Sequence, residues 1–462
     1  MHLRSLCAVL AALVLAAAPA AAASDPPSAN ATPAAAAPTA NGPVAIANGL
    51  LDQLDAGDFA GAEARFDAQM AAAVPAAKLK ELWASLPAQV GASRGRGEAR
   101  VSNVNGLQMV AIPLHYEKAE LLAQVAINDK GQISGFLVKP APAPQAAAPA
   151  TDAPFTEQPF RVGPGETGLP GTLALPKGQS PGSGWPAVVL VHGSGPHDRD
   201  ETVGPNRPFL DIARGLADEG IAVLRYDKRT MARPQDFSAG DYTVDDETTN
   251  DAVLAVAALR GTPGIDASRI YVLGHSQGAM LAPRIARKVA QSGAPVAGLV
   301  MLAAPARPLL DILPEQNRYL LQADGDILPA EQAFLDDLDA KIARVRSGQA
   351  MPDKDTPLSL PASYWRDFDT IDPVADALAV DVPTLLLQGG RDFQVVDTDW
   401  QLWQRALAGH ANATLKHYAP LNHLGITGSG PGSMAEYQKA GHVDAGLIAD
   451  IASWINQQST RN

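Results

Sequence analysis

From Phe155 onward the chain alternates short, nearly continuous apolar runs with longer amphipathic segments. The runs lie at residues 187–191, 222–226, 270–273, 298–302 and 384–387. Such runs are typical of strands buried on both faces of a parallel sheet, because a half-exposed strand would alternate apolar and polar residues. Segments between them, such as 209–219 and 251–259, have the pattern of helices. The alternation predicts an α/β fold with a doubly wound, mostly parallel sheet.

One connection in this pattern is much longer than the others. Helical segments between about residues 306 and 372 separate the runs at 298–302 and 384–387. A connection between neighbouring parallel strands needs only one helix, so this segment exceeds what the sheet requires. We expect it to form a helical lid.

The first residues have the features of an export signal. Arg4 precedes an apolar stretch at 8–18, and a run of alanines ends at Ala23. This arrangement predicts a secretory signal peptide at residues 1–23. The stretch is too short for a comfortable membrane span. Cys7, the only cysteine, precedes it, so we expect no disulfide in the mature protein, which would be periplasmic or secreted by a bacterium.

Two Ala/Pro-rich segments divide the remaining chain. Residues 24–42 and 140–154 contain few large apolar side chains, so they are predicted to be linkers. They bracket a predicted small α+β domain at 43–139, and the α/β domain follows at 155–460. The small domain is expected to contain helices at 44–54, 60–70 and 79–86 and strands at 108–116, 119–127 and 133–138, with a hairpin turn at 128–131. Substrate binding, cell-wall binding and passive tethering remain open as its role.

A Gly-x-Ser-x-Gly pentapeptide, residues 274–278, directly follows the apolar run at 270–273 and precedes a helix start. A serine at a tight strand-to-helix turn has its hydroxyl exposed, and glycines on either side leave room for the turn. To act as a nucleophile, a serine needs a base and a carboxylate that orients the base. Ser276 is therefore the predicted nucleophile.

The orienting acid is expected in the loop after a late strand. Asp392 lies there, just beyond Gly389 and Gly390, while Asp397 and Asp399 are fallback candidates further from the strand end. An aspartate that merely caps the loop is the structural alternative.

His423 is the predicted base. It follows a strand expected at 414–418, and active residues of such sheets collect at the carboxyl ends of strands. His410 precedes this strand and His417 lies within it, both poor positions for a base. His442, expected at the start of the last helix, is the runner-up.

The developing oxyanion requires donors that are already in place. One is expected to be the backbone N–H of Gln277. The other is expected from the loop at 192–196, with Ser194 as first choice and Gly195 behind it. His192 is expected to support this loop rather than to transfer protons.

Four further motifs accompany the pentapeptide: 192–196 with 198–201, 225–229, 388–392, and 422–423. With them, residues 155–458 resemble the α/β-hydrolase superfamily, specifically its secreted bacterial esterase and serine-aminopeptidase-like branch. The small domain resembles the uncharacterised domain often found in front of secreted bacterial hydrolases. The resemblance implies a serine esterase that cleaves carboxylic esters with short acyl groups through an acyl-enzyme. Ser276, Asp392 and His423 match the catalytic positions of that family.

Other functions remain as alternatives. The same triad would serve an aminopeptidase or a thioesterase, and a non-catalytic binding protein is a further alternative that the intact triad disfavours. A dienelactone-hydrolase-like enzyme would carry cysteine in place of Ser276. No metal-binding His-x-x-x-His or His-Glu-x-x-His motif occurs, so we expect neither metal nor cofactor.

The charge of the chain indicates which kinds of molecule it binds. The net charge of -13 argues against nucleic acid as a partner, and we expect a small-molecule ester substrate, with the oligomeric state open. Acidic and basic residues are interleaved at 198–201 and 227–229. These clusters are suited either to binding a substrate carboxylate or to forming buried ion pairs that hold the two loops together, and we favour the ion pairs.

Overall fold

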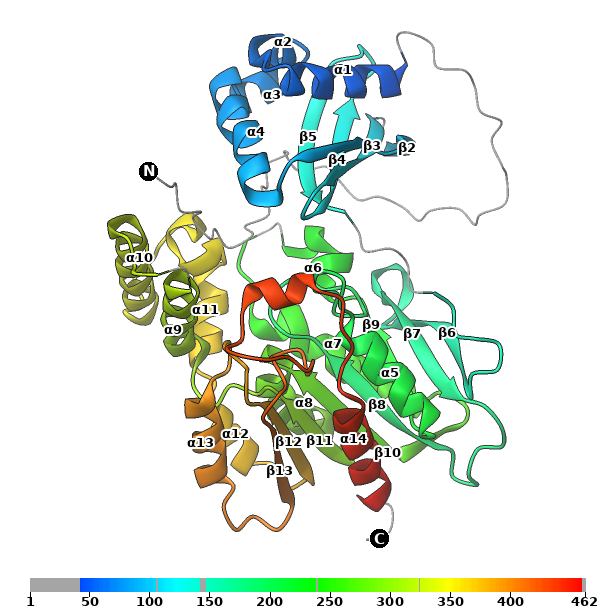
Figure 1. The fold of residues 1–462 in the computed structure, drawn as a ribbon. Helices are drawn as coiled ribbons and strands as arrows, with labels where there is room; N and C mark the ends of the chain where they lie inside the picture. Colours follow the sequence, from blue (N-terminus) through cyan, green and yellow to red (C-terminus); the bar gives the residue numbers. More distant parts are fainter. Residues whose placement is uncertain (1–41, 105–106, 142–146, 238–239, 324, 459–462) are drawn as a thin grey trace. The chain divides into compact units, whose positions relative to one another are not determined.

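The computed structural model describes residues 42–104, 107–141, 147–237, 240–323 and 325–458 (Figure 1). The predicted signal peptide and almost all of the first predicted linker lie outside these residues. The chain divides into two compact units, Met1–Pro144 and Gln145–Asn462.

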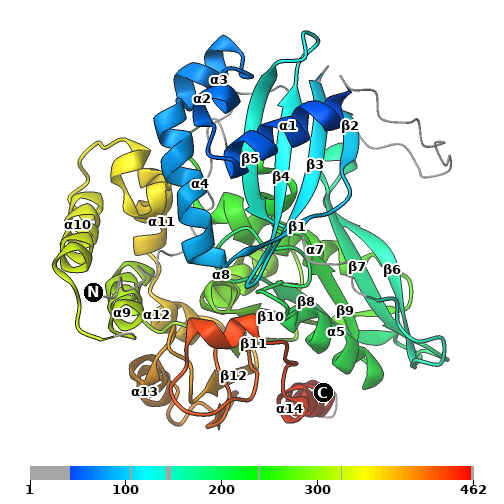
Figure 2. The ribbon, with the colours of Figure 1, turned by 45° about the horizontal axis from the view of Figure 1, so that its top comes forward.

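The first unit packs four helices against an antiparallel five-stranded sheet (Figure 2). Leu50, Leu51 and Leu54 of α1 are buried against Val110 and Ile112 of β3. The elements are α1 (Pro43–Asp55), α2 (Phe59–Glu63), α3 (Ala68–Ala73), α4 (Ala76–Val90), β1 (Ser93–Arg96), β2 (Arg100–Val104), β3 (Leu107–Tyr116), β4 (Glu120–Ile127) and β5 (Ile133–Pro140). Strands β1 and β2 were not expected from the sequence.

The helix expected at 60–70 is wrong, because the chain forms two short helices there. Phe66 leaves the helical path to form a bridge with Ile133 of β5. The Asp67 carboxylate then accepts a hydrogen bond from Met70 N at 2.8 Å and caps α3. An aspartate at this position satisfies a backbone N–H that has no partner within the helix, so it starts a new helix.

The second unit contains an eight-stranded sheet in the order β13-β12-β11-β10-β8-β9-β7-β6. All neighbouring strands from β13 to β9 are parallel, whereas β7 and β6 extend the sheet antiparallel at one edge. The strands are β6 (Phe155–Val162), β7 (Leu169–Pro176), β8 (Trp185–Val191), β9 (Ala222–Tyr226), β10 (Ile265–His275), β11 (Gly298–Leu302), β12 (Thr384–Gly389) and β13 (Ala413–Tyr418). The predicted α/β class is confirmed, while β6 and β7 were missed.

Helices cover both faces of this sheet (Figure 1). On one face, α5 (Pro208–Asp218) and α14 (Ala445–Gln458) pack against Val188 and Leu190 of β8. On the other face, α7 (Asn250–Arg260), α8 (Gln277–Gln291) and α13 (Asp397–Ala406) share a core with Val189 and Val191. Successive residues of β8 thus serve opposite cores, which is why its sequence is apolar without alternation.

The long segment between β11 and β12 is helical, as expected for the region called a lid above. It contains α9 (Leu309–Gln322), α10 (Pro329–Arg346), α11 (Ala362–Asp369) and α12 (Pro373–Leu378). Trp365 and Phe368 of α11 are fully buried in the same core as α8. Trp365 therefore anchors this segment to the sheet.

Short elements fill the remaining connections. Helix α6 (Arg229–Ala232) follows β9, and a π-helical turn, Asp245–Thr249, leads into α7. Turns of 3₁₀ helix lie at Gly165–Thr167, Pro234–Phe237, Asp353–Asp355, Pro357–Ser359 and Met434–Gln438.

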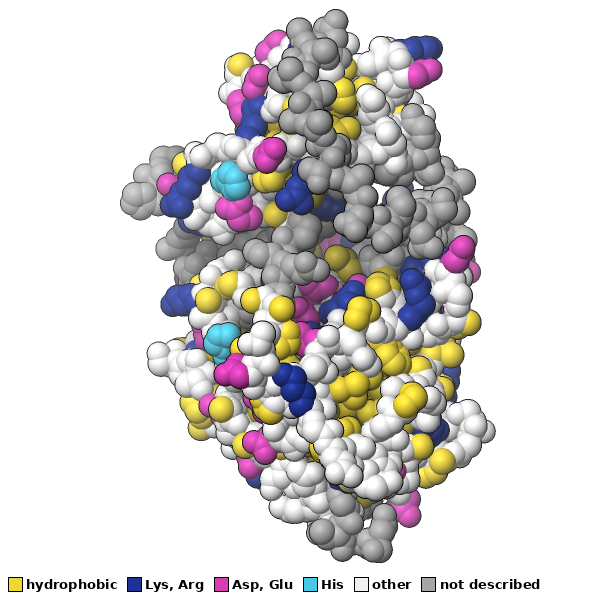
Figure 3. Space-filling view, turned by 90° about the vertical axis from the view of Figure 1, so that its right-hand side faces the viewer, with side chains coloured by type: hydrophobic (Ala, Val, Ile, Leu, Met, Phe, Trp, Pro, Cys, Tyr) yellow, Lys and Arg dark blue, Asp and Glu magenta, His cyan; other side chains and the backbone are white. Residues whose placement is uncertain are grey.

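On one face of the molecule, apolar side chains lie in patches between acidic and basic ones (Figure 3). Large apolar side chains that are more than a third exposed are distributed over several elements: Val101, Met231, Leu254, Leu328, Phe334, Leu358, Leu378 and Met434. Among the helices in the described ranges, none is long and apolar enough to cross a membrane.

Candidate active site

Ser276 occupies a sharp corner between β10 and α8. Its backbone has φ 53° and ψ -118°, a conformation that residues other than glycine rarely adopt. A Cβ on Gly274 would lie 2.2 Å from the carbonyl oxygen of Gly278, and a Cβ on Gly278 would lie 2.2 Å from that of Val191. Only glycine fits at either position. The pentapeptide is thus what allows this strained corner to form.

The candidate residues come together at one edge of the sheet. Ser194 follows β8, Ser276 follows β10, Asp392 follows β12 and His423 follows β13. Parallel strands end at the same edge, which brings these four loops together. The loop before Ser194 runs directly against Ser276, since a Cβ added to Gly193 would lie 3.3 Å from Ser276 Cβ.

Asp392 and His423 form a buried pair. Asp392 Oδ2 lies 2.7 Å from His423 Nδ1, and the Asp392 side chain is fully buried. Its Oδ1 accepts hydrogen bonds from the backbone N–H groups of Gln394 at 2.8 Å and Val395 at 2.9 Å. Gln388 Nε2 donates to Oδ2 at 3.2 Å. The carboxylate is therefore fixed in orientation and accepts the Nδ1 proton of His423.

The glycines of the motif at 388–392 let the histidine loop approach the acid. A Cβ on Gly389 would lie 2.5 Å from the carbonyl oxygen of Leu421. One on Gly390 would lie 2.8 Å from Ala419 Cα. Side chains at these positions would push the loop that carries His423 away from Asp392.

The fallback acids do not reach His423 through any hydrogen bond of the described residues. Asp399 is fully buried and binds Arg307, with 2.6 Å between Oδ2 and Nη2. Asp397 accepts a hydrogen bond from Gln401 on the same helix. Both carboxylates thus have partners of their own in α13 or beside it.

The remaining candidate histidines lie elsewhere. His410 is exposed in the turn before β13, and His417 lies within β13 with its ring against Trp400. His442 is exposed and lies 3.0 Å from Asp211. The expectation that His442 starts the last helix is wrong, because α14 begins only at Ala445.

The predicted nucleophile and the predicted base are connected through His275, the residue before Ser276. His275 Nε2 lies 2.9 Å from the carbonyl oxygen of His423, and the centres of the two rings are 4.6 Å apart. Within the described part of the chain, the Ser276 hydroxyl itself makes no hydrogen bond. Catalytic hydrogen bonds are often long without substrate and tighten when it binds.

The two expected oxyanion donors are both available. Gln277 is the first residue of α8, and the first N–H groups of a helix have no acceptor within it. Neither Gln277 N nor Ser194 N donates to any acceptor in the ranges that the structure covers. An oxyanion at the start of α8 would also face the positive end of the helix dipole.

A second buried acid–histidine pair lies beside the elbow. Glu201 Oε2 lies 3.0 Å from His275 Nδ1, and the two atoms form an ion pair whose angles are not those of a hydrogen bond. The other oxygen, Oε1, accepts a hydrogen bond from Gly193 N at 2.6 Å. Burial lowers the pKa of His275, but the Glu201 carboxylate and the His423 carbonyl outweigh it, and the pKa is raised. Burial raises the pKa of Glu201, yet its histidine neighbours reduce it to about 2. The Glu201 carboxylate is therefore ionised, and its charge favours the protonated form of His275.

A third buried charged group lies behind the Ser194 loop. Lys228 Nζ lies 3.0 Å from Glu247 Oε1 and donates to the carbonyl oxygen of Gly193 at 2.8 Å. The other Glu247 oxygen accepts hydrogen bonds from Gln277 Nε2 and from the Tyr364 hydroxyl. Burial, followed by the Glu247 charge, raises the pKa of Tyr364 well above its usual value, so the phenol stays protonated as a donor.

The clusters at 198–201 and 227–229 form ion pairs, as favoured above. The Arg199 guanidinium group donates two hydrogen bonds to Asp227, of 2.9 and 2.8 Å, and so joins the two loops. Asp200 pairs with Arg225. His192 Nε2 lies 3.0 Å from the carbonyl oxygen of Asp198, and burial lowers the pKa of His192 to about 3. A neutral His192 has Nε2 as the donor, consistent with support of the loop.

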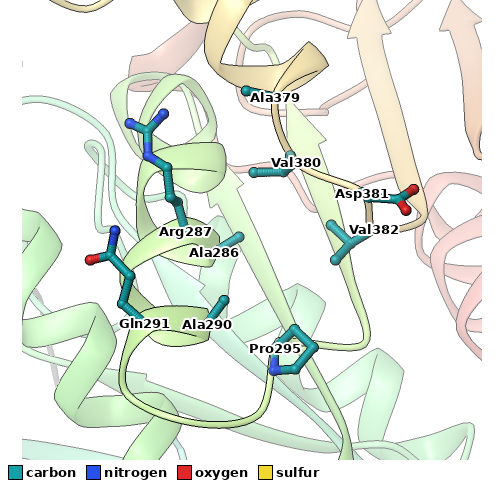
Figure 4. A pocket seen from close by; sticks show the side chains of 9 residues that line it. All are labelled: Ala286, Arg287, Ala290, Gln291, Pro295, Ala379, Val380, Asp381 and Val382. Atoms are coloured by element: carbon teal, nitrogen blue, oxygen red, sulfur yellow. The ribbon is translucent and has the colours of Figure 1, made fainter.

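A hollow between α8 and the segment before β12 does not belong to this site (Figure 4). It is lined by Ala286, Arg287, Ala290, Gln291, Pro295, Ala379, Val380, Asp381 and Val382. Val382 precedes β12, so the hollow lies at the opposite edge of the sheet from Ser276. Across the ranges the structure describes, no three His, Cys, Asp or Glu side chains are grouped to hold a metal ion.

Sequence reasoning missed the roles of several polar residues at the site. Glu201 and Lys228 were seen only as members of charged clusters and Gln388 only as part of the motif at 388–392, and Glu247 was not considered. The available signal was weak: a lysine two residues after the strand 222–226 and a glutamate before a helix are common on protein surfaces. Only their burial in the folded chain, 2% exposed for Lys228 and 6% for Glu247, distinguishes them.

Comparison with known proteins assigns both units to families. Residues 188–442 match the alpha/beta hydrolase family, and residues 47–136 match a protein of unknown function, DUF3887. The esterase EstD of Thermotoga maritima is 37% identical over 388 residues, which cover 84% of this chain and 89% of that protein.

Solved structures of esterases are more distant. Est1E of Butyrivibrio proteoclasticus is 18% identical, with a TM-score of 0.42 and 66% of this chain and 99% of that chain covered. The esterase of Pyrobaculum calidifontis is 16% identical, with a TM-score of 0.40 and coverage of 66% and 86%. These scores are too low to add to the comparison of sequences.

Proposed function

This chain belongs to the α/β-hydrolase family and is a carboxylic ester hydrolase, and from this premise we propose that it forms an acyl-enzyme on Ser276. Asp392 and His423 complete the triad, and the N–H groups of Gln277 and Ser194 bind the oxyanion. The preferred esters carry short acyl groups, as the resemblance to secreted bacterial esterases implies.

The observation that carries this proposal is the contact of 2.7 Å between Asp392 Oδ2 and His423 Nδ1 beside the strained Ser276 corner. An acid that accepts the Nδ1 proton leaves Nε2 of the same ring free to accept a proton from a serine. The chain order of serine, acid and histidine is also that of α/β-hydrolases.

In the proposed reaction, Ser276 Oγ attacks the ester carbonyl carbon and His423 Nε2 takes the hydroxyl proton. The tetrahedral oxyanion accepts hydrogen bonds from Gln277 N and Ser194 N. The intermediate collapses, His423 returns the proton to the leaving alcohol, and the acyl group stays on Ser276. Water then attacks the acyl-enzyme by the same steps and releases the carboxylic acid.

The test is the Ser276→Ala variant, with hydrolysis of p-nitrophenyl acetate and butyrate as the assay. We expect a folded protein whose kcat is reduced by several orders of magnitude, about 10⁴-fold or more. A fluorophosphonate probe should label the wild-type protein and leave the variant unlabelled. Turnover by the variant at the wild-type rate would refute the proposal.

Substrate class is tested separately with the wild-type protein. Its kcat/KM for p-nitrophenyl esters of increasing acyl length is compared with that for aminoacyl amides and thioesters. The proposal predicts the highest value for a short-chain ester. A higher value for an amide or a thioester would assign the same triad to a peptidase or a thioesterase instead.

A further inference from the structure

The carbonyl oxygen of Gly193 is held by a buried lysine. Lys228 Nζ donates to it at 2.8 Å, and the lysine is only 2% exposed. This carbonyl belongs to the same peptide group as the N–H of Ser194. A peptide group is planar and trans, so its C=O and N–H point in opposite directions. Whatever fixes the direction of the Gly193 carbonyl therefore fixes the direction of the Ser194 N–H.

We propose that Lys228 is a positioning residue for ester hydrolysis, which orients the Ser194 N–H toward the oxyanion by holding the Gly193 carbonyl. The inference rests on the proposed function, in which Ser194 N is an oxyanion donor. The lysine acts through the peptide group and does not touch the substrate.

Lys228 is itself held in place by a chain of buried contacts that begins at Gln277. Gln277, the residue after Ser276, donates from Nε2 to Glu247 Oε2 at 2.8 Å. Glu247 Oε1 lies 3.0 Å from Lys228 Nζ. The two oxyanion donors, Gln277 N and Ser194 N, are thus linked through Gln277, Glu247, Lys228 and Gly193. This chain sets their separation by side-chain contacts rather than by the loop alone.

The loop needs such a restraint. Glu201 holds Gly193 N, which belongs to the preceding peptide group, so it leaves the Gly193–Ser194 peptide free to rotate. Glycine permits rotations that other residues do not, and Ser194 is exposed. A rotated peptide would direct a carbonyl oxygen at the oxyanion in place of the N–H. The positive charge on Lys228 also polarises the peptide group and strengthens the N–H as a donor.

If the Lys228–Glu247 ion pair only stabilised the fold, every variant that breaks it would have the same effect on kcat. Two variants separate this structural role from the positioning role. Lys228→Met alone would leave Glu247 charged and unpaired in the interior, which is strongly destabilising. The double variant Lys228→Met/Glu247→Gln removes both charges and the donor to Gly193. The matched control, Glu247→Gln, also breaks the ion pair and leaves a buried ammonium without its acid, but it retains the Lys228 hydrogen bond to Gly193.

With p-nitrophenyl butyrate, the double variant should lose about 10- to 100-fold in kcat, because loss of a whole oxyanion donor costs about 10²–10³-fold. Its KM should stay within about twofold, since the oxyanion exists only after attack. Glu247→Gln loosens Lys228 but keeps its hydrogen bond to Gly193, so it should lose about tenfold less kcat than the double variant. A boronic acid, which forms a tetrahedral adduct with serine, should lose affinity for the double variant by about the same factor as kcat.

Equal kcat values for the double variant and the Glu247→Gln control would overturn the inference. A structure of the wild-type protein with fluorophosphonate bound to Ser276 provides a test that does not depend on the folding of any variant. The phosphonyl oxygen should accept from Ser194 N while Lys228 remains on Gly193 O. A Ser194 N–H directed away from that oxygen would overturn the inference as well. If Ser276→Ala remains active, the proposed function fails; if only the Lys228 tests fail, the proposed function stands.

Discussion

The replacement Asp392→Asn removes one charge and changes no heavy-atom position. Oδ1 of Asp392 accepts from two backbone N–H groups, at 2.8 and 2.9 Å. The asparagine oxygen must take this place, because an NH₂ group there would face two donors. The NH₂ group then occupies the place of Oδ2, 2.7 Å from His423 Nδ1. A donor there requires an unprotonated Nδ1, so the proton moves to Nε2 and His423 cannot accept one from Ser276.

The size of the effect follows from the cost of turning the amide around. Only an amide rotated by 180°, with its oxygen toward His423 Nδ1, restores the tautomer in which Nε2 can accept a proton. This rotation leaves the two backbone N–H donors unsatisfied, at about 1–3 kcal/mol each, or about 2–6 kcal/mol together. Since 1.36 kcal/mol is a factor of ten, the active tautomer falls to about one part in 30 to one part in 10⁴. We therefore expect kcat for p-nitrophenyl acetate to fall by about 30- to 10⁴-fold, while the protein remains folded.

The assay measures kcat per active site, counted by titration with the fluorophosphonate probe. The matched control is Asp399→Asn, which neutralises another fully buried aspartate of the neighbouring helix whose partner is Arg307. It should keep kcat within about threefold of the wild-type value, although its melting temperature is expected to fall. An Asp392→Asn variant as active as wild type, or an Asp399→Asn variant that is inactive but folded, would refute the assignment of the acid.

Two further predictions concern stability and domain organisation. Glu201, whose pKa falls from 4.5 to about 2, stabilises the fold above pH 4.5 and loses this contribution as the pH falls toward 2. His275, whose pKa is raised above 6.5, stabilises it below pH 6.5 and loses this contribution as the pH rises through its folded value. The test is the difference in unfolding free energy between wild type and Glu201→Gln, measured with urea. This difference should be largest at about pH 5–6, and a difference that stays constant from about pH 3 to 9 would contradict the ion pair. Deletion of residues 24–150 removes the first unit and should leave turnover of small esters largely intact. A truncated protein that folds but has no turnover would instead show that the first unit contributes to the site.

Much of the second unit was predictable from the sequence because its signals are local. Continuous apolar runs identify strands buried on both faces, whatever the rest of the chain does. Gly274 and Gly278 mark the corner at Ser276, where a Cβ would clash with backbone. Asp392 and His423 were expected at the ends of late strands, and the structure brings Asp392 Oδ2 and His423 Nδ1 to 2.7 Å.

Features that depend on contacts with distant parts of the chain could not be predicted. The helix expected at 60–70 is interrupted where Phe66 pairs with Ile133. The last two strands at one edge of the sheet, β7 and β6, have no continuous apolar run. The sequence alone thus determined the parallel part of the sheet, the corner at Ser276 and the order of the candidate triad. Only the tertiary structure decided that Glu201 and Lys228 are buried against the Ser194 loop and that Glu247 pairs with Lys228. A charged side chain looks the same in a sequence whether it faces water or a buried partner. The partner can also be far along the chain, since the hydrogen bond between Glu247 and Tyr364 joins residues that are 117 positions apart.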